Sequence, residues 1–179
     1  TDSKGCTSTD AVVVTVNPLP SVDAGADREI CYGFSSTLTA VGSGGTPGYT
    51  YLWSNGATTS SITVNPTTTT TYGVTVTDGN GCSGSASVTV KVNALPTPSI
   101  SGDNEICNGE STTLIASGGS SYVWSNGSTA SSISVSPTTN TTYSVKVTDS
   151  NGCSASASVT VKVNILPTPT IVGDTEICN

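Results

Sequence analysis

Apolar side chains recur at every second position in short stretches of this chain, and Gly, Asn and Pro separate the stretches. The clearest stretch carries Tyr72, Val74 and Val76. Others carry Tyr49, Tyr51 and Trp53, then Ile62 and Val64, then Val88, Val90 and Val92. Period-two alternation places such residues on one face of a β-strand, and no stretch follows the 3.6-residue period of a helix. The pattern predicts an all-β protein.

The same pattern occurs twice in nearly the same sequence. The Trp-Ser-Asn-Gly block at Trp53 returns at Trp124, and the block that ends at Cys82 returns with its end at Cys153. A further Asp-Ser-Lys-Gly-Cys ending stands at residues 2–6. Such self-similarity indicates an array of domains. We expect a window of a longer fibre, with the last strand of a preceding repeat at 1–17, complete repeats at 18–93 and 94–164, and the first strand of a following repeat at 165–179.

Each complete repeat is predicted to contain seven short strands. In the first repeat, one short strand is expected to open at Leu19-Pro20. The others are expected at Arg28 to Cys31, Ser35 to Ala40, Tyr49 to Trp53, Ile62 to Val64, Tyr72 to Val76 and Val88 to Val92. Two sheets with their apolar faces packed together, and turns at about ten-residue spacing, are typical of an immunoglobulin-like (Ig-like) β-sandwich. We therefore expect tandem seven-stranded Ig-like sandwiches that form a rod.

Four aromatic residues are expected in the two cores. Trp53 and Trp124 fall where Ig-like folds bury a tryptophan on strand C, and Tyr72 and Tyr143 open the sixth strand, the place of a tyrosine corner. Stacking of the tryptophans on a sugar is the alternative. Alternation with inward tyrosines favours the core.

Composition narrows the possible functions. The 12 Asp and Glu residues outnumber the 5 Lys and Arg residues, for a net charge of −7, which argues against nucleic acid as a partner. The sequence contains no His, the usual residue for general-base and triad chemistry. No stretch of 18 apolar residues predicts a membrane span. We expect no enzyme activity, no cofactor and no metal site.

The linkers between repeats are short and proline-rich. Residues 93–98 read Asn-Ala-Leu-Pro-Thr-Pro, and residues 164–169 read Asn-Ile-Leu-Pro-Thr-Pro. Alternate prolines favour a stiff, extended connection. Such linkers should limit bending between neighbouring repeats.

Six cysteines occupy two repeating positions. Cys31, Cys107 and Cys178 stand near the start of each repeat, and Cys6, Cys82 and Cys153 stand near the end. None forms a Cys-x-x-Cys pair of the kind that binds zinc. A regular cysteine framework in small domains indicates an oxidising, extracellular setting.

The expected topology separates the two cysteines of one repeat. Cys31 precedes the first turn and Cys82 follows the last turn, so they should lie at opposite ends of a strand that spans about 33 Å. Bridged Cα atoms lie within about 7 Å. Because the end where one repeat's chain leaves faces the end where the next begins, we predict an inter-repeat disulfide between Cys31 and Cys153. The partners of Cys6, Cys82, Cys107 and Cys178 are then expected outside this sequence.

The alternative is a bridge within each repeat. Cys31 would then pair with Cys82, and Cys107 with Cys153, if the strand placement is wrong by one hairpin. Either arrangement closes a large loop, which the chain-entropy treatment values at roughly 5 kcal/mol.

Two acidic patterns raise the question of calcium. Asp78-x-Asn80-Gly81 and Asp149-x-Asn151-Gly152 resemble the start of a calcium loop, but no carboxylate follows at the far end, and Asn-Gly is typical of a hairpin turn. Glu29, Glu105 and Glu176, with Asp103 and Asp174, lie near the first cysteine of each repeat. A solvated surface is the interpretation we adopt, with calcium at a joint as the alternative.

The threonine-rich runs at 67–71 and 138–142 are interpreted as solvated connections into the sixth strand, with O-glycosylation as the alternative. Asn126-Gly127-Ser128 and Asn140-Thr141-Thr142 are formal N-glycosylation sequons. We do not expect those sequons to be used.

The stretch from Gly44 to Thr59, which reads GGTPGYTYLWSNGATT, resembles the SprB-type repeat of surface adhesins in gliding Bacteroidota. The Val-Thr-Asp-x-Asn-Gly-Cys ending fits that family, and the Ile-Cys-x-Gly start at Ile30 and Ile106 is similar to PKD-like and Ig-like repeats of the same secreted proteins. The second repeat has Gly-Gly-Ser-Ser-Tyr at 118–122 in place of the Gly-Gly-Thr-Pro segment. The resemblance implies a cell-surface or secreted fibre, exported by the type IX route and used in adhesion or gliding motility, with no catalytic residues.

These observations predict a structural stalk of a bacterial cell-surface adhesin, stiffened by disulfides. Its partners are expected to be neighbouring repeats, with surface polysaccharide and self-assembly into filaments as further candidates. Self-assembly would use strand addition at Val12, Val14 and Val16, or at 168–171. The alternatives are a glycan- or partner-binding module and an accessory region of a secreted enzyme.

Overall fold

The computed structural model describes residues 1–173 and contains fifteen β-strands and no helix in that range. The chain divides into two compact units, Thr1–Val92 and Asn93–Asn179. No helix long and apolar enough to cross a membrane occurs in the described residues.

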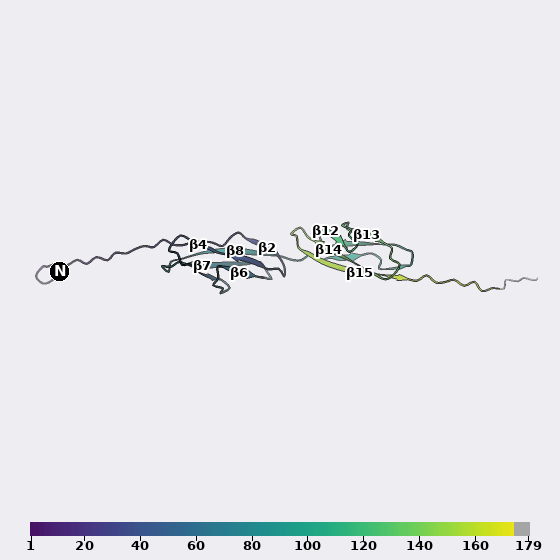
Figure 1. Ribbon diagram of the computed structural model, residues 1–179, viewed down its shortest axis with the longest axis horizontal. Helices are drawn as coiled ribbons and strands as arrows, with labels where there is room; N and C mark the ends of the chain where they lie inside the picture. Colours follow the sequence, from purple (N-terminus) through teal and green to yellow (C-terminus); the bar gives the residue numbers. More distant parts are fainter. Residues whose placement is uncertain (174–179) are drawn as a thin grey trace, which may run out of the picture. The chain divides into compact units, whose positions relative to one another are not determined.

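The second unit is a sandwich of seven strands in two sheets. The strands are β9 (Ser99–Ser101), β10 (Glu105–Cys107), β11 (Thr112–Ser117), β12 (Ser121–Trp124), β13 (Ser132–Val135), β14 (Thr141–Thr148) and β15 (Ser154–Asn164). One sheet has the order β13-β11-β9 and the other the order β10-β15-β14-β12. All pairs are antiparallel except β10 with β15, which is parallel. This order is that of an Ig-like sandwich, and β15 runs the length of the unit (Figure 1).

Alternation along each strand builds the core of this unit. On β11, Thr112, Leu114 and Ala116 are buried, whereas the residues between them are exposed. The same alternation on β14 buries Val145 and Val147. The full core contains Ile106, Leu114, Ala116, Trp124, Ile133, Val135, Val145, Val147 and Val161.

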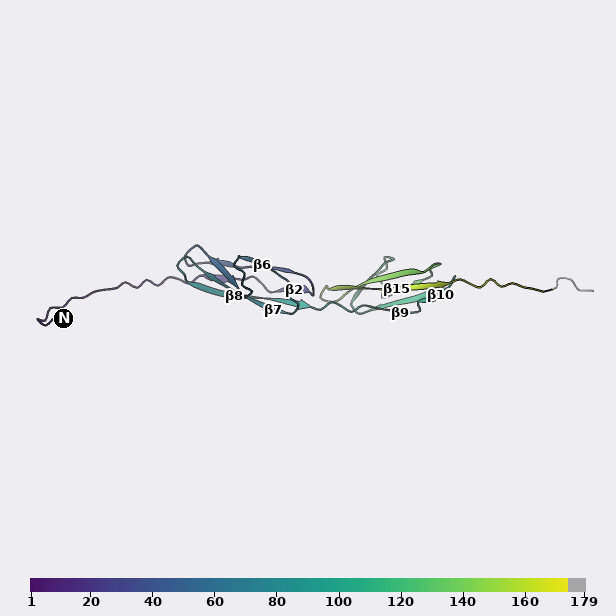
Figure 2. The same ribbon diagram turned by 90° about the horizontal axis from the view of Figure 1, so that it is seen from below.

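The first unit has the same plan with one strand interrupted. Its strands are β1 (Ser21–Asp23), β2 (Arg28–Cys31), β3 (Ser36–Thr39), β4 (Val41–Ser43), β5 (Thr50–Trp53), β6 (Ser61–Val64), β7 (Thr70–Thr77) and β8 (Ser83–Asn93). The order β2-β8-β7-β5 matches the four-stranded sheet of the second unit, while β3 pairs with β6 and β4 pairs with β1. Figure 2 labels β2, β8 and β7 in this unit, where β8 lies between β2 and β7 in the sheet. The all-β, Ig-like fold expected from the sequence is confirmed.

Strand β4 was not expected. It continues β3 beyond Ala40, as the single strand β11 does in the second unit. Its central Gly42 lies against the core, where a Cβ would stand 2.9 Å from Val76 Cγ1 and 3.1 Å from Tyr49 Cγ. The glycine is therefore required by close packing, although in the sequence it looks like the start of a turn.

Both tryptophans lie at the centre of their units. Trp53 and Trp124 are each 2% exposed, and each indole Nε1–H donates a hydrogen bond of 2.9 Å to a backbone carbonyl, that of Thr59 or Ala130. Burial removes the ring faces from any sugar, so stacking on a glycan is excluded for both.

The ends of the described chain carry no strands. Residues 7–20 and 165–173 have no strand assignment, and Val12, Val14 and Val16 are 79–88% exposed. The expected strands of neighbouring repeats at 1–17 and 165–179 therefore have no sheet to join here, and their assignment stays a prediction. Residues 174–179 lie outside the described residues.

Replacing Leu114 with alanine should lower the free energy of unfolding of the second unit by about 2–5 kcal/mol, because the side chain is fully buried and leaves a cavity. Ile115→Ala is the matched control on the same strand, where the side chain is 48% exposed. Urea denaturation followed by tryptophan fluorescence measures both. Equal losses in the two variants would contradict the register of β11.

Candidate functional site

A tight turn presents the second cysteine of each repeat. In the first unit the N–H of Asp78 donates to the Cys82 carbonyl at 2.9 Å, and the N–H groups of Asn80 and Cys82 donate to Asp78 Oδ1 at 3.0 and 2.9 Å. The same set forms around Asp149 and Cys153, at 2.9, 2.8 and 2.9 Å. The carboxylate thus holds the turn, which agrees with the hairpin interpretation.

The turn forms again at residues 2–6, where there is no sandwich. The N–H groups of Lys4 and Cys6 both donate to Asp2 Oδ1 at 2.9 Å. These bonds, that from Cys6 first, hold the pKa of Asp2 below its ordinary value. Local hydrogen bonding is therefore enough to set this turn.

In the first unit, a neighbouring loop also bonds to the turn at Asp78. We call this contact of Thr46 with Asp78 and Asn80 the clasp. The shorter second repeat has Gly-Gly-Ser-Ser-Tyr at 118–122 in place of this segment, whereas residues 44–48 of the first repeat dock on the turn at Asp78. The N–H of Thr46 donates to Asp78 Oδ2 at 2.9 Å, and the side-chain amide of Asn80 donates to Thr46 Oγ1 at 2.7 Å. The Thr46 bond is the main cause that holds the pKa of Asp78 below its ordinary value, with smaller contributions from Cys82 and Asn80.

This clasp was missed by sequence reasoning. The sequence shows only that the first repeat is longer before Trp53, and it does not show which residues the extra segment contacts. The hydroxyl of Tyr49 also closes the loop by donating to the carbonyl of Gly44. Both oxygens of Asp78 accept bonds from backbone N–H groups, which supports the turn interpretation.

The first cysteine of each repeat sits at a different turn. Strand β10 ends at Cys107, and the N–H of Glu110 donates to the Cys107 carbonyl at 3.0 Å. Gly109 at the third position has φ +96°, as a type II turn requires. The Glu110 carboxylate accepts a bond from the Cys107 N–H at 3.0 Å. Cys31 precedes the same turn, in which the N–H of Phe34 donates to its carbonyl at 3.0 Å.

This turn does not join two paired strands, so the first turn that we expected after the cysteine does not close a hairpin. The strand before it, β10, pairs with β15, whereas the strand after it, β11, pairs with β9 and β13. The chain therefore crosses from one sheet to the other at this point. The cysteine is left at the rim of the four-stranded sheet.

The two cysteines of the second unit lie at opposite ends of β15. Cys107 is the partner of Asn164, the last residue of that strand, and Cys153 directly precedes its first residue. Eleven residue steps along a strand span about 36 Å, far beyond the roughly 7 Å that a disulfide allows between Cα atoms. We call the end with Asn164 the distal end and the end with Cys153 the proximal end. A bridge within this unit is geometrically excluded.

The cysteines also differ in redox state. Cys31 and Cys153 are disulfide-bonded. Cys6, Cys82 and Cys107 are free thiols in the described part of the chain, the first exposed and the others half-buried. Cys178 lies outside the described residues. Bridges within each repeat would need Cys82 and Cys107, so that alternative is not the one formed.

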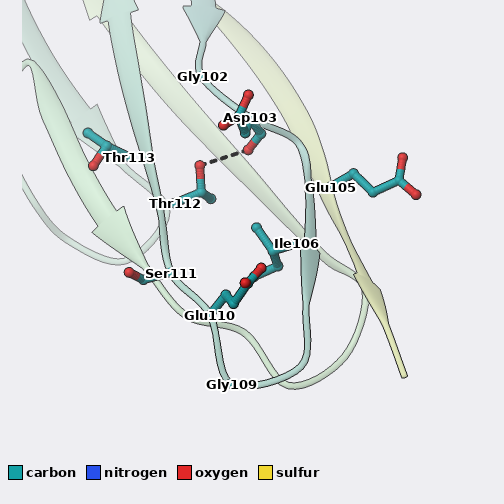
Figure 3. Close-up of a pocket in the computed structure, with 9 residues that line it drawn as sticks. All are labelled: Gly102, Asp103, Glu105, Ile106, Gly109, Glu110, Ser111, Thr112 and Thr113. Carbon is teal, nitrogen blue, oxygen red and sulfur yellow. Dashed lines mark hydrogen bonds between the residues drawn. The ribbon is translucent and has the colours of Figure 1, made fainter. Parts of the chain in front are cut away.

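An acidic depression lies at the distal end of the second unit. It has a volume of about 710 Å³ and is lined by the Asp103 to Ile106 segment and by Gly109 to Thr113. In Figure 3, Asp103 and Glu110 lie toward the depression while Glu105 points away from it. Thr112 Oγ1 donates to the Asp103 carbonyl at 2.8 Å, and Glu105 accepts a bond from the Asn164 amide at 3.0 Å.

These carboxylates do not converge. No group of three or more His, Cys, Asp or Glu side chains that could hold a metal occurs in residues 1–173. Calcium at this position therefore has no ligand set there, and Asp174 and Glu176 lie outside the described residues. The depression is a solvated rim of the sandwich.

Hydroxyl groups form the outer surface of the sheets. Thr71 and Thr89 face each other across β7 and β8 with their Oγ1 atoms 3.0 Å apart, and Thr142 and Thr160 do so at 2.8 Å across β14 and β15. Such cross-strand pairs are part of what stabilises a sheet. The threonines thus have a structural role in both units.

Tyr72 and Tyr143 pack, partly buried, against the two cores. The structure gives neither hydroxyl a hydrogen bond to another described residue, so the expected tyrosine corner does not form. The tyrosines that bond back to the backbone are Tyr49 and Tyr122, whose hydroxyl donates to the Gly119 carbonyl at 3.0 Å.

Comparisons place the chain only at the level of fold. No protein-family model and no curated protein sequence matches it. Among solved structures, the N-terminal four Ig domains of Dscam1 isoform 6.9 are 12% identical with a TM-score of 0.39, over 86% of this chain and 48% of that chain. This chain therefore spans about half the length of that structure.

Two further structures are also similar. A 1.5-MDa bacterial ice-binding adhesin is 17% identical with a TM-score of 0.45, over 84% of this chain and 66% of that chain. Murine CEACAM1b is 14% identical with a TM-score of 0.38, over 82% of this chain and 100% of that chain. Because these scores are low, the Ig-like assignment rests on the strand order and register given above.

The clasp yields a matched pair of variants. Asp78→Asn places an NH₂ group opposite the Thr46 N–H, donor against donor, and should free the loop at 44–48. Asp149→Asn should not disturb the equivalent loop, because the second oxygen of Asp149 accepts no bond from a described residue. The amide resonance of Thr46 in a two-dimensional NMR spectrum reports the result, and an unchanged Thr46 resonance in Asp78→Asn would refute the clasp.

The same bond makes the clasp sensitive to acid. Because the folded-state pKa of Asp78 is depressed, its ionised carboxylate adds stability above the ordinary aspartate pKa of 3.8, and this stability is lost as the pH falls through the folded-state value. Acid titration should therefore release Thr46 in the native chain, and Asp78→Asn should show no such transition.

Proposed function

We propose that this chain is a load-bearing segment of an extracellular bacterial adhesion fibre, in which Ig-like sandwiches supply length. The observation that carries the proposal is the placement of Cys107 and Cys153 at opposite ends of the second unit, at sequence positions that recur along the chain. The resemblance to SprB-type repeats supports a cell-surface location, type IX export and a part in gliding. The fold itself is common to adhesion and receptor proteins.

The mechanism is a disulfide bond between successive repeats, which we call the staple. Cys31, at the distal end of the first repeat, pairs with Cys153, at the proximal end of the second. Three findings support this pairing: both residues are disulfide-bonded, the cysteines needed for bridges within repeats are free, and the length of β15 excludes such a bridge.

The staple matters because each unit is small. A domain of this size buries only about 60% of the surface its unfolded chain exposes. A link that closes 122 residues (153 minus 31) is worth roughly 5 kcal/mol in the chain-entropy treatment, which is comparable to the whole stability of such a domain. The proline linker at 93–98 adds stiffness without a covalent bond.

A glycan- or partner-binding module is the second candidate function. The observation that favours it is an exposed aromatic pair beside Cys31, with Tyr32 at 51% and Phe34 at 63% exposure. The second repeat has Asn108 and Glu110 in these places. The double variant Tyr32→Asn, Phe34→Glu should abolish binding to any surface polysaccharide recognised in an array, and equal binding by variant and native chain would reject this function.

Pulling the chain from its two termini tests the staple. With Cys31 bonded to Cys153, force cannot extend the 122 residues between them, so reduction should add about 430 Å of contour length. Bridges within repeats would instead protect two shorter segments from extension, of 51 residues (82 minus 31) and 46 residues (153 minus 107). Reduction would then release their contour length in two separate steps. Single-molecule force spectroscopy distinguishes one large gain from two smaller ones.

The control is the double variant Cys31→Ser, Cys153→Ser. It should release the full contour length whether or not a reductant is present. A native chain whose extension is the same before and after reduction would show that no staple bears load, and only the proline linkers would then stiffen the fibre.

A further inference from the structure

The free cysteines occupy the same two positions as the bonded ones. Cys107 stands in the second unit where Cys31 stands in the first, and Cys82 stands in the first unit where Cys153 stands in the second. Cys31 and Cys153 are disulfide-bonded, whereas Cys82 and Cys107 are free thiols. Each of the two cysteine positions is therefore disulfide-bonded in one unit and a free thiol in the other.

The backbone presents both sets in the same way. The N–H of Cys82 donates to Asp78 Oδ1 at 2.9 Å, as that of Cys153 does to Asp149 Oδ1. The turn after Cys107 closes with the same 3.0 Å bond as the turn after Cys31. Because these contacts lie within single turns, they hold each thiol in place whether or not a partner is present.

Both free thiols remain accessible. Cys82 and Cys107 are half-buried, not enclosed. The loop at 44–48 bonds to Asp78 and Asn80, and no hydrogen bond joins it to Cys82 in the described residues.

We propose that the partner for these thiols is a second copy of this chain, with Cys107 of one copy bonded to Cys82 of the next. The inference rests on the proposed function, because it applies the pairing of Cys31 with Cys153 to a contact between copies. The two bonded positions differ, so the contact is heterologous and each copy bonds on two sides. Such contacts produce open filaments when they do not close into a ring.

The bond requires an oxidant, and a low-molecular-weight disulfide such as oxidised glutathione supplies it. A thiolate at Cys107 attacks one glutathione sulfur and releases one glutathione thiol. The thiolate of Cys82 in the second copy then attacks the mixed disulfide and releases the other. One sulfur–sulfur bond forms for each one broken, and the two protons of the cysteine thiols end on two glutathione molecules.

The test uses the full chain with Cys6→Ser and Cys178→Ser, so that Cys82 and Cys107 are the only thiols left if Cys31 and Cys153 are bonded. Oxidation with oxidised glutathione at high protein concentration should give a ladder of dimers, trimers and larger species on a non-reducing gel. Reduction should collapse the ladder. A tryptic digest of the oxidised protein should contain peptide 92–146 disulfide-linked to peptide 29–91. Fragmentation of this product in the mass spectrometer should place the bond at Cys82.

Two controls decide the outcome. Adding Cys82→Ser or Cys107→Ser leaves one thiol per chain, so every species larger than a dimer should disappear. A chain that stays monomeric with both thiols free, or that links only Cys82 to Cys82 and Cys107 to Cys107, would overturn the inference.

The same digest separates this failure from failure of the proposed function. Peptide 29–91 joined at Cys31 to peptide 147–162 would show that the staple within the chain stands while the contact between copies does not form. Loss of both links would overturn both proposals.

Discussion

The length of the last strand in each unit is the constraint on which the rest depends. β15 runs eleven residues without interruption, with Cys153 just before its start and Cys107 paired to its end. A separation of about 36 Å cannot be bridged by a disulfide. Each of these two cysteines can therefore form a disulfide only with a cysteine outside this unit. Alternation fixes this strand in the sandwich, because Val161 is fully buried while its neighbours remain accessible.

The conformation of the turn before the second cysteine of each repeat depends on short-range hydrogen bonds and not on packing of the core. The turn at Asp2 forms the same bonds as those at Asp78 and Asp149 although no sandwich adjoins it. A cysteine held in a turn of this kind keeps its direction before it meets a partner, which lowers the entropy cost of bonding. The repeats thus separate two tasks. The core gives length, and the turns give connection points that are the same in every repeat.

Sequence reasoning recovered most of the fold because alternation and turn residues are local signals. Arg28–Cys31 was predicted to the residue, and seven strands were found for the second unit. Strand β4 was missed because Gly42 serves close packing against Val76, which no local pattern reveals. The Thr46 clasp on Asp78 joins residues 32 positions apart. The tyrosine corner was predicted from position alone, but the hydroxyls of Tyr72 and Tyr143 bond to no described residue, whereas those of Tyr49 and Tyr122 bond to the backbone.

Disulfide mapping of the native, unreduced chain tests the central claim most directly. Trypsin leaves Cys31 and Cys82 on peptide 29–91, Cys107 on 92–146 and Cys153 on 147–162. Staples between repeats predict that 29–91 is linked to 147–162, with Cys82 and Cys107 alkylated by a thiol reagent. A bond between Cys31 and Cys82 inside 29–91, together with a link between 92–146 and 147–162, would contradict the staple and leave each repeat an independent domain.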